Sequence, residues 1–350
     1  MLSRRSVRIK VMQLLYMLNR DEQIAFTDLV KDYNDGIWKT YELYIFQLHL
    51  LLKVAQYAEK DAANRSAKLL PGEDDRAFTP RLYTNACTQS LANHVVFQNI
   101  VAKYKVNEGL DEDLIRTLYQ AFADTDEYKN YLGLSEPALD DHKKILVELY
   151  RFLVNHDVFI EMSEDRYNNW QDDESLVTGA MKKTLKVMPV EGEFYKEHEP
   201  SDETVREFGE QLLRKTCQED LALFNEIEPT LKNWDAERVA ILDMIMLKMA
   251  LCELLHFPTI PTKVTLNEYV EISKTYSTDK SKDFINGILD RLMKKLIKEE
   301  RIVKEGPAPA RHASSCRRTA RGERRVQILS VRPAPGFLRR GGSLRRAAHA

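Results

Sequence analysis

Glycine and proline are scarce in this 350-residue chain, with 13 and 12 residues respectively. Only eight of each fall within residues 1–305, which is too few for a loop-rich or strand-rich fold. The same scarcity disfavours nucleotide-binding folds, which cradle phosphates in glycine-rich loops. The composition therefore predicts an all-α protein.

Metal-binding and disulfide patterns are also missing from the sequence. The four cysteines (Cys87, Cys217, Cys252 and Cys316) form no CxxC pair, and the eight histidines have no HxH or HxxxH spacing. We therefore expect no metal, no disulfide framework, no cofactor and a reducing compartment. No residue stands out as catalytic.

The longest apolar stretch, residues 239–255, is interrupted by Asp243, Lys248 and Glu253. At 100° per residue these charges point in different directions, so the stretch predicts a core helix and not a membrane span. The three charged side chains are expected to make buried or half-buried polar contacts. A cytoplasmic protein without membrane contact is the resulting expectation.

The formal net charge of −2 is the sum of two unlike parts. Residues 306–350 contain eleven Arg, no Lys and one acidic residue, while residues 1–305 have a net charge of −12. Arginine without lysine, together with abundant Ala, Gly, Pro and Ser, is the composition expected when GC-rich DNA is translated in the wrong reading frame. We expect a disordered tail or frameshift artefact from residue 306, and we therefore give its charge no functional weight.

Apolar residues recur with the helical period along residues 1–305. Helices are predicted over residues 7–18, 37–59, 80–104, 111–123, 138–155, 174–187, 202–222, 235–256 and 281–300. Another is predicted to begin at Thr265, because Thr265 and Glu268 have capping-box spacing. Gly287 lies within the last predicted helix, where glycine costs about 1 kcal/mol. It predicts a close approach between helices, and direct proximity to a bound nucleic acid is the alternative.

The first twenty residues are basic and contain no acidic residue. Arg4, Arg5 and Arg8 are three or four residues apart, so on a helix they repel one another unless an anion is near. A nucleic-acid footprint explains such a cluster, and a solvated basic face is the alternative. Tyr16 could stack an unpaired base or complete the edge of the core.

The order of these motifs resembles the NusB family of transcription antitermination factors. The resemblance is carried by the arginine-rich start that leads into residues 13–16, and by four downstream segments. Those segments are residues 240–254, 260–264, 266–274 and 284–290. The similar stretches are residues 1–20 and about 205–297, and residues 21–204 contain no recognisable motif of the family.

This resemblance implies an all-α NusB-like fold of two helical subdomains, here with an enlarged N-terminal half. We expect residues 1–204 to form the N-terminal subdomain and residues 205–300 the C-terminal subdomain. The family binds single-stranded boxA RNA of ribosomal-RNA leader transcripts with the ribosomal protein NusE, in an RNA polymerase antitermination complex. Carried over by position, the RNA-binding residues are Arg4, Arg5, Arg8, Lys10, Gln13, Tyr16, Lys280, Ser281, Lys282 and Phe284.

The loop before Phe284 departs from the family pattern, which has an acidic residue before the serine and a lysine before the phenylalanine. This chain has Lys280 and Asp283 at those positions, and Lys282 could supply the displaced charge.

The sequence leaves two other functions open. One is a helical adaptor that binds only a protein partner. The other is the NusB-like domain of a ribosomal-RNA cytosine methyltransferase, which is disfavoured because no proline precedes any cysteine.

Overall fold

The computed structural model describes residues 1–21, 23–231 and 239–304. Within these ranges every regular element is a helix, so the predicted all-α class is confirmed. The described residues form two compact units. The first unit comprises Met1–Ser3 and Asn34–Val205, and the second comprises Arg4–Tyr33 and the described residues from Arg206 onward. These units divide the chain differently from the predicted subdomains, because the basic start packs with the C-terminal part. The predicted tail, residues 306–350, lies outside the described ranges.

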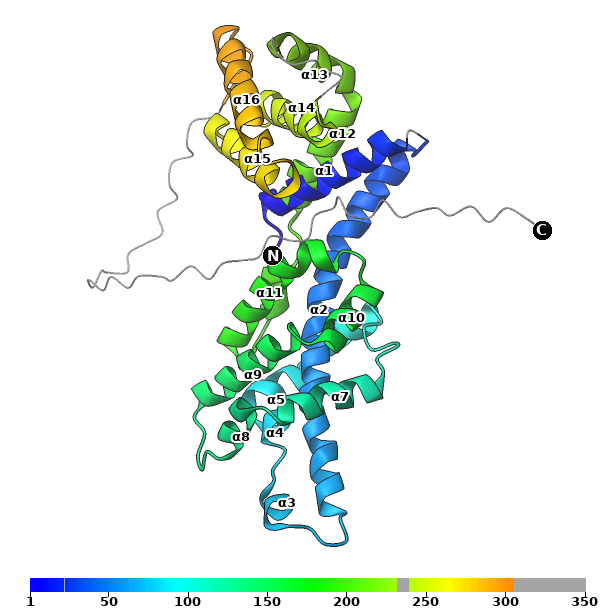
Figure 1. Ribbon diagram of the computed structural model, residues 1–350, viewed down its shortest axis with the longest axis vertical. Coiled ribbons are helices and arrows are strands. Elements are labelled where there is room, and N and C mark those ends of the chain that lie inside the picture. Colours follow the sequence, from blue (N-terminus) through cyan, green and yellow to red (C-terminus); the bar gives the residue numbers. More distant parts are fainter. Residues whose placement is uncertain (22, 232–238, 305–350) are drawn as a thin grey trace, which may run out of the picture. The chain divides into compact units, whose positions relative to one another are not determined.

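The second unit contains the basic start of the chain (Figure 1). Its helices pack around α14, whose residues from Ile245 to Leu254 are almost all buried. α15 (Thr262–Tyr276) and α16 (Ser281–Lys298) pack against α14 and against each other, and α1 (Arg4–Arg20) also packs against α14. The elements are α1 (Arg4–Arg20), the start of α2 (Phe26–Ser66), the larger part of the π-helical η2 (Glu203–Glu210), α12 (Gln211–Gln218), α13 (Asp220–Ile227), η3 (Glu228–Thr230), α14 (Ile241–His256), α15 (Thr262–Tyr276) and α16 (Ser281–Lys298).

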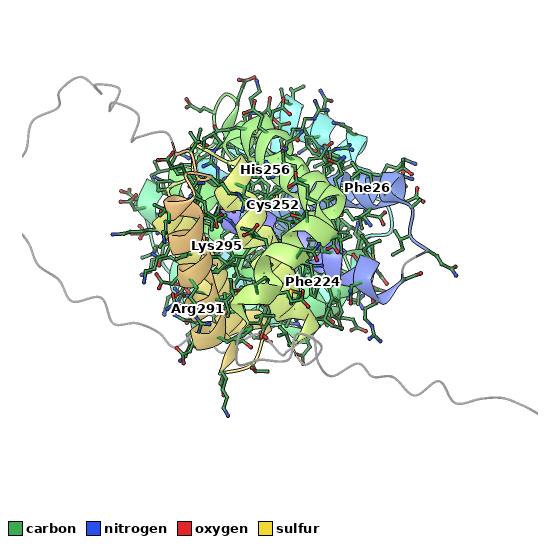
Figure 2. All side chains as sticks on the ribbon, turned by 90° about the horizontal axis from the view of Figure 1, so that it is seen from above. Phe26, Phe224, Cys252, His256, Arg291 and Lys295 are labelled. Atoms are coloured by element: carbon green, nitrogen blue, oxygen red, sulfur yellow. The ribbon has the colours of Figure 1, made fainter. Side chains whose placement is uncertain are left out.

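The amphipathic pattern of α16 explains its place in this unit. Ile285, Ile288, Leu289, Leu292 and Leu296 are buried, and the three- and four-residue steps between them put all five on one face. On other faces, Lys295 pairs with Glu226 of α13 at 2.5 Å and Arg291 donates to the Thr230 carbonyl at 2.9 Å. Figure 2 shows Arg291 and Lys295 along α16. These contacts fix α16 to α13 and η3.

The first unit is built along the larger part of α2 (Figure 1). Buried polar contacts connect α2 to its neighbours: Thr40 donates to Asp173 of α11 at 2.6 Å, and Tyr150 of α9 donates to Gln47 at 2.6 Å. Its other elements are α3 (Glu73–Ala77), α4 (Arg81–Thr84), α5 (Ala86–Ala92), α6 (Val95–Lys103), α7 (Glu112–Ala123), α8 (Asp126–Leu132), α9 (Leu139–Leu153), α10 (Asp157–Arg166), α11 (Trp170–Val187) and η1 (Phe194–His198).

Net charge differs between the two units. Residues 34–205 contain 31 acidic and 19 basic side chains, whereas the rest of residues 1–305 contains 22 of each. The whole net charge of −12 of residues 1–305 therefore lies in the first unit.

Candidate nucleic-acid interface

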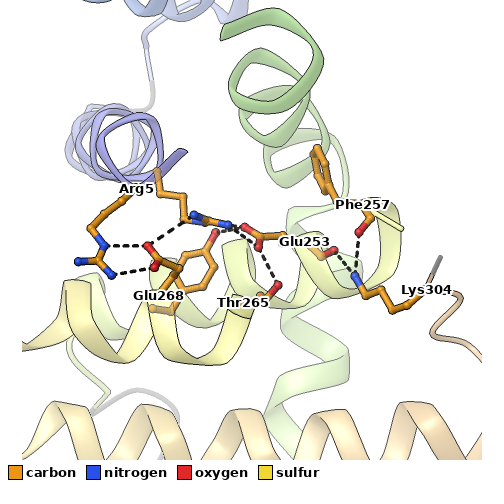
Figure 3. Close-up of polar contacts among 8 residues, drawn as sticks. Arg5, Glu253, Phe257, Thr265, Glu268 and Lys304 are labelled. Carbon is orange, nitrogen blue, oxygen red and sulfur yellow. Dashed lines mark hydrogen bonds and ion pairs between the residues drawn. The ribbon is translucent and has the colours of Figure 1, made fainter. Parts of the chain in front are cut away.

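Arg8 is buried within the second unit, with 1% of its surface exposed. Val7, Val11 and Met12 hold this face of α1 in the core. The Arg8 Nε and Nη2 atoms donate to the two carboxylate oxygens of Glu253 on α14, at 2.8 and 2.7 Å (Figure 3). The geometry is a bidentate ion pair between two buried side chains.

Other groups complete the surroundings of this ion pair. Thr265 Oγ1 and the Tyr269 hydroxyl, both on α15, donate to Glu253 at 2.7 and 3.3 Å. The Arg8 guanidinium lies 4.9 Å from the centre of the Phe208 ring and 5.8 Å from that of Tyr269. Burial alone would lower the pKa of Arg8, but the bonds to Glu253 outweigh it and the pKa is raised.

Arg8 is therefore not accessible to a phosphate in this conformation, and its contact with RNA stays a prediction. Its positive charge is compensated by Glu253, and its guanidinium is closed off from solvent. Arg8 instead joins α1, α14 and α15.

Arg5 lies one turn earlier on α1 and is accessible. Its side chain is 50% exposed and donates from Nε and Nη2 to Glu268 of α15, both at 2.7 Å (Figure 3). The hydrogen bonds to Glu268 raise the pKa of Arg5 and lower that of Glu268. Arg5 is consequently held at the surface in a fixed orientation, with a carboxylate beside it.

The remaining predicted residues of α1 are neither fully exposed nor fully buried. Arg4 lies 5.6 Å from the centre of the Phe208 ring, which positions its guanidinium near that of Arg8 on the same aromatic group. Lys10, Gln13 and Tyr16 are half-buried. α1 thus presents Arg4, Arg5 and Lys10 as its partly or largely accessible predicted cations.

The second predicted stretch lies where α15 ends and α16 begins. Lys280 and Lys282 are exposed and Phe284 is half-buried, but Ser281 is 2% exposed. Ser281 Oγ donates to Asp243 of α14 at 2.7 Å. Ser281 is therefore not accessible to RNA in this conformation, whereas both lysines are, and the RNA contacts of all three residues stay predictions.

The apolar helix predicted from residues 239–255 makes the polar contacts expected of it. Asp243 and Glu253 are buried and hydrogen-bonded, and Lys248 pairs with Asp220 at 2.6 Å. This prediction is confirmed.

The capping-box prediction at Thr265 is wrong, because α15 begins one turn earlier, at Thr262. Thr265 and Glu268 lie inside the helix and bind Glu253 and Arg5. The sequence shows the right pair of side chains here, but it cannot show that their partners come from distant helices.

The prediction for Gly287 is also wrong. A Cβ atom at Gly287 would meet no atom within 4 Å, so no neighbouring helix requires the glycine. The close approach occurs at Gly209 of η2, where a Cβ would overlap the Tyr33 hydroxyl and Val7.

Among the described residues, no helix combines the length and apolar composition needed to cross a bilayer. The same part of the chain has no group of three or more His, Cys, Asp or Glu side chains placed to hold one metal ion.

Comparison with known proteins supports the resemblance seen in the motifs. The model of the NusB family matches residues 168–294. The match begins inside the region that contains no recognisable motif, two residues before α11, and it does not include residues 1–20.

Three curated relatives are each named "Transcription antitermination protein NusB". The relative from Salinibacter ruber is 38% identical over 105 residues, which are 30% of this chain and 66% of the relative. The relative from Methylacidiphilum infernorum is 39% identical over 95 residues, which are 27% of this chain and 66% of the relative. The relative from Chloroherpeton thalassium is 50% identical over 58 residues, which are 17% of this chain and 28% of the relative. No solved structure matches the chain significantly.

Proposed function

Because the chain belongs to the NusB family through residues 168–294, we propose that it is a cytoplasmic, non-enzymatic transcription antitermination factor that binds single-stranded RNA. Its target is boxA-type RNA in nascent ribosomal-RNA transcripts. The second unit supplies the RNA-binding surface.

The Arg8–Glu253 ion pair is the observation that carries this proposal. The family match alone does not include the basic start of the chain. Arg8 fastens that start to Glu253, which lies within the matched segment, and both side chains are buried. The basic start is therefore part of the same folded unit as the larger part of the family segment, from Arg206 onward.

The accessible cations of this unit suit a polyanion. Arg5, Lys280 and Lys282 can neutralise phosphates while unpaired bases contact nearby aromatic and polar groups. α15 connects the two groups of cations, because Glu268 binds Arg5 and the chain reaches Lys280 soon after the end of the helix. From Glu268 to Tyr276 the helix rises about 12 Å, a short distance along an RNA strand.

The protein partners of the proposal are NusE and the RNA polymerase antitermination complex. The charge of the first unit, with 31 acidic and 19 basic side chains in residues 34–205, supports a basic ribosomal protein as partner. Co-purification of NusE with the full chain tests this part of the proposal. A partner that binds while RNA does not would instead support the helical adaptor.

RNA titrations of the full chain at several salt concentrations test the RNA-binding function. Arg5→Ala combined with Lys282→Ala should weaken binding to a boxA-type oligonucleotide, because both side chains are accessible cations. Each lost phosphate contact should make the slope of log K against log salt shallower by about 0.7. Lys144→Ala, at an exposed lysine of α9, is the matched control and should change neither quantity. Equal behaviour of the double variant and the control would contradict the proposed RNA surface.

A further inference from the structure

Asp243 holds the junction between α15 and α16 from the neighbouring helix α14. Its carboxylate is 5% exposed and accepts from Ser277 Oγ at 2.6 Å and from Ser281 Oγ at 2.7 Å. The two serines bind different oxygens of the carboxylate. Ser277 is the C-cap residue that directly follows α15, and Ser281 is the first residue of α16. One buried carboxylate therefore fixes both ends of the turn.

Further hydrogen bonds stiffen the same turn. Thr278 Oγ1 lies 2.8 Å from Ser281 Oγ, and the Ser281 amide donates to the Thr278 carbonyl at 2.9 Å. Asp243 also places a negative charge beside the first turn of α16, where the helix dipole favours an anion. The residues from Ser277 to Ser281 thus have little freedom to reorient.

This anchoring decides the direction of two exposed cations. Lys280 and Lys282 are the sequence neighbours of Ser281, and both are exposed whereas Ser281 is buried. Neighbouring residues of a helix point about 100° apart, so a Ser281 turned inward directs the lysines away from the core on either side of it. A rotation of Ser281 would move both ammonium groups.

We propose that Asp243 is a positioning residue for RNA binding, which holds Lys280 and Lys282 where they meet the phosphates of the bound strand. The inference rests on the proposed RNA-binding function. Asp243 itself does not contact RNA, because it is buried and both of its oxygens are occupied. Its effect is to have the turn ordered before the RNA arrives, which lowers the entropic cost of binding.

A double-mutant cycle with the full chain and a boxA-type RNA oligonucleotide tests this role. Lys280→Ala combined with Lys282→Ala should reduce the RNA affinity of the otherwise wild-type protein about 5- to 10-fold. Asp243→Asn alone should reduce that affinity by a similar factor. In the Asp243→Asn protein the two lysine substitutions should reduce the affinity for RNA by about 2-fold or less, because the lysines are no longer held in position. Asp243→Asn should also reduce the salt dependence of binding, although it removes no cation.

Ser277 provides a second, milder pair of variants in case Asp243→Asn does not fold. Ser277→Ala removes one of the two bonds to Asp243 and leaves the Ser281 bond intact, so it should weaken RNA binding and reduce the salt dependence. Ser277→Thr keeps the hydroxyl and should restore both quantities. Circular dichroism melts identify the variants that are folded.

The outcomes separate the inference from the proposed function. Suppose that the folded Asp243 or Ser277 variants bind RNA more weakly, but that the lysine substitutions cause the same loss of RNA affinity in these variants as in the wild-type protein. The positioning role of Asp243 is then overturned, whereas the proposed RNA-binding function stands. If the wild-type chain does not bind the RNA, the proposed function and the positioning role both fall.

Discussion

Arg5 and Arg8 are three residues apart on α1, and the fold uses their charges in different ways. Arg8 is closed into the core against Glu253, whereas the side chain of Arg5 is 50% exposed beside Glu268. The spacing predicts that these arginines repel one another unless an anion is near, and two carboxylates of the same unit provide the anions. Those partners lie on α14 and α15, 245 and 263 residues further along the chain. Local sequence patterns contain no information about such a pairing.

Substitution of these two arginines should have very different effects on stability. Arg8→Ala leaves Glu253 buried without a cation and should reduce the free energy of unfolding by about 3–5 kcal/mol. Arg5→Ala removes a surface pair and should cost less than about 1 kcal/mol. Urea unfolding followed by circular dichroism measures both values. Similar losses for the two variants would show that the Arg8 pair is no more important to the fold than a surface ion pair.

At the scale of helices, periodicity and caps predict the elements whose signals are local. The residues of α7, α9 and α16 follow the predicted ranges closely, and Asp111, where the first of these ranges begins, is the N-cap of α7. The single helix predicted over residues 80–104 is instead divided into α4, α5 and α6. Asn85 and His94 accept hydrogen bonds from the amides of Thr88 and Phe97, and these new N-caps break the helix. The spacing of apolar residues does not reveal such side-chain N-caps.

The two glycines of the second unit provide a paired test of helix packing. Gly287→Ala should raise the free energy of unfolding by up to about 1 kcal/mol, because alanine favours the helix and meets no neighbour. Gly209→Ala should lower it by about 1–3 kcal/mol, because its Cβ would overlap Tyr33 and Val7. Thermal melts of the two variants make the comparison. A stabilised Gly209→Ala protein or a strongly destabilised Gly287→Ala protein would contradict this packing.

At the scale of the whole molecule, charge separates the two units. The first unit carries the entire net charge of −12 of residues 1–305, and the second is neutral overall with accessible cations on α1 and α16. The sequence alone shows the sum but not this division, because the second unit is assembled from both ends of the described chain. An acidic first unit repels a nucleic acid, so the RNA should be confined to the second unit.

Crosslinking of the full chain to boxA-type RNA, followed by mass spectrometry of the attached peptides, tests this assignment most directly. We predict crosslinks at the start of α1, around Arg4 and Arg5, and around the junction of α15 and α16 that contains Lys280 and Lys282. Crosslinks found mainly within residues 34–205 would contradict the assignment of RNA binding to the second unit.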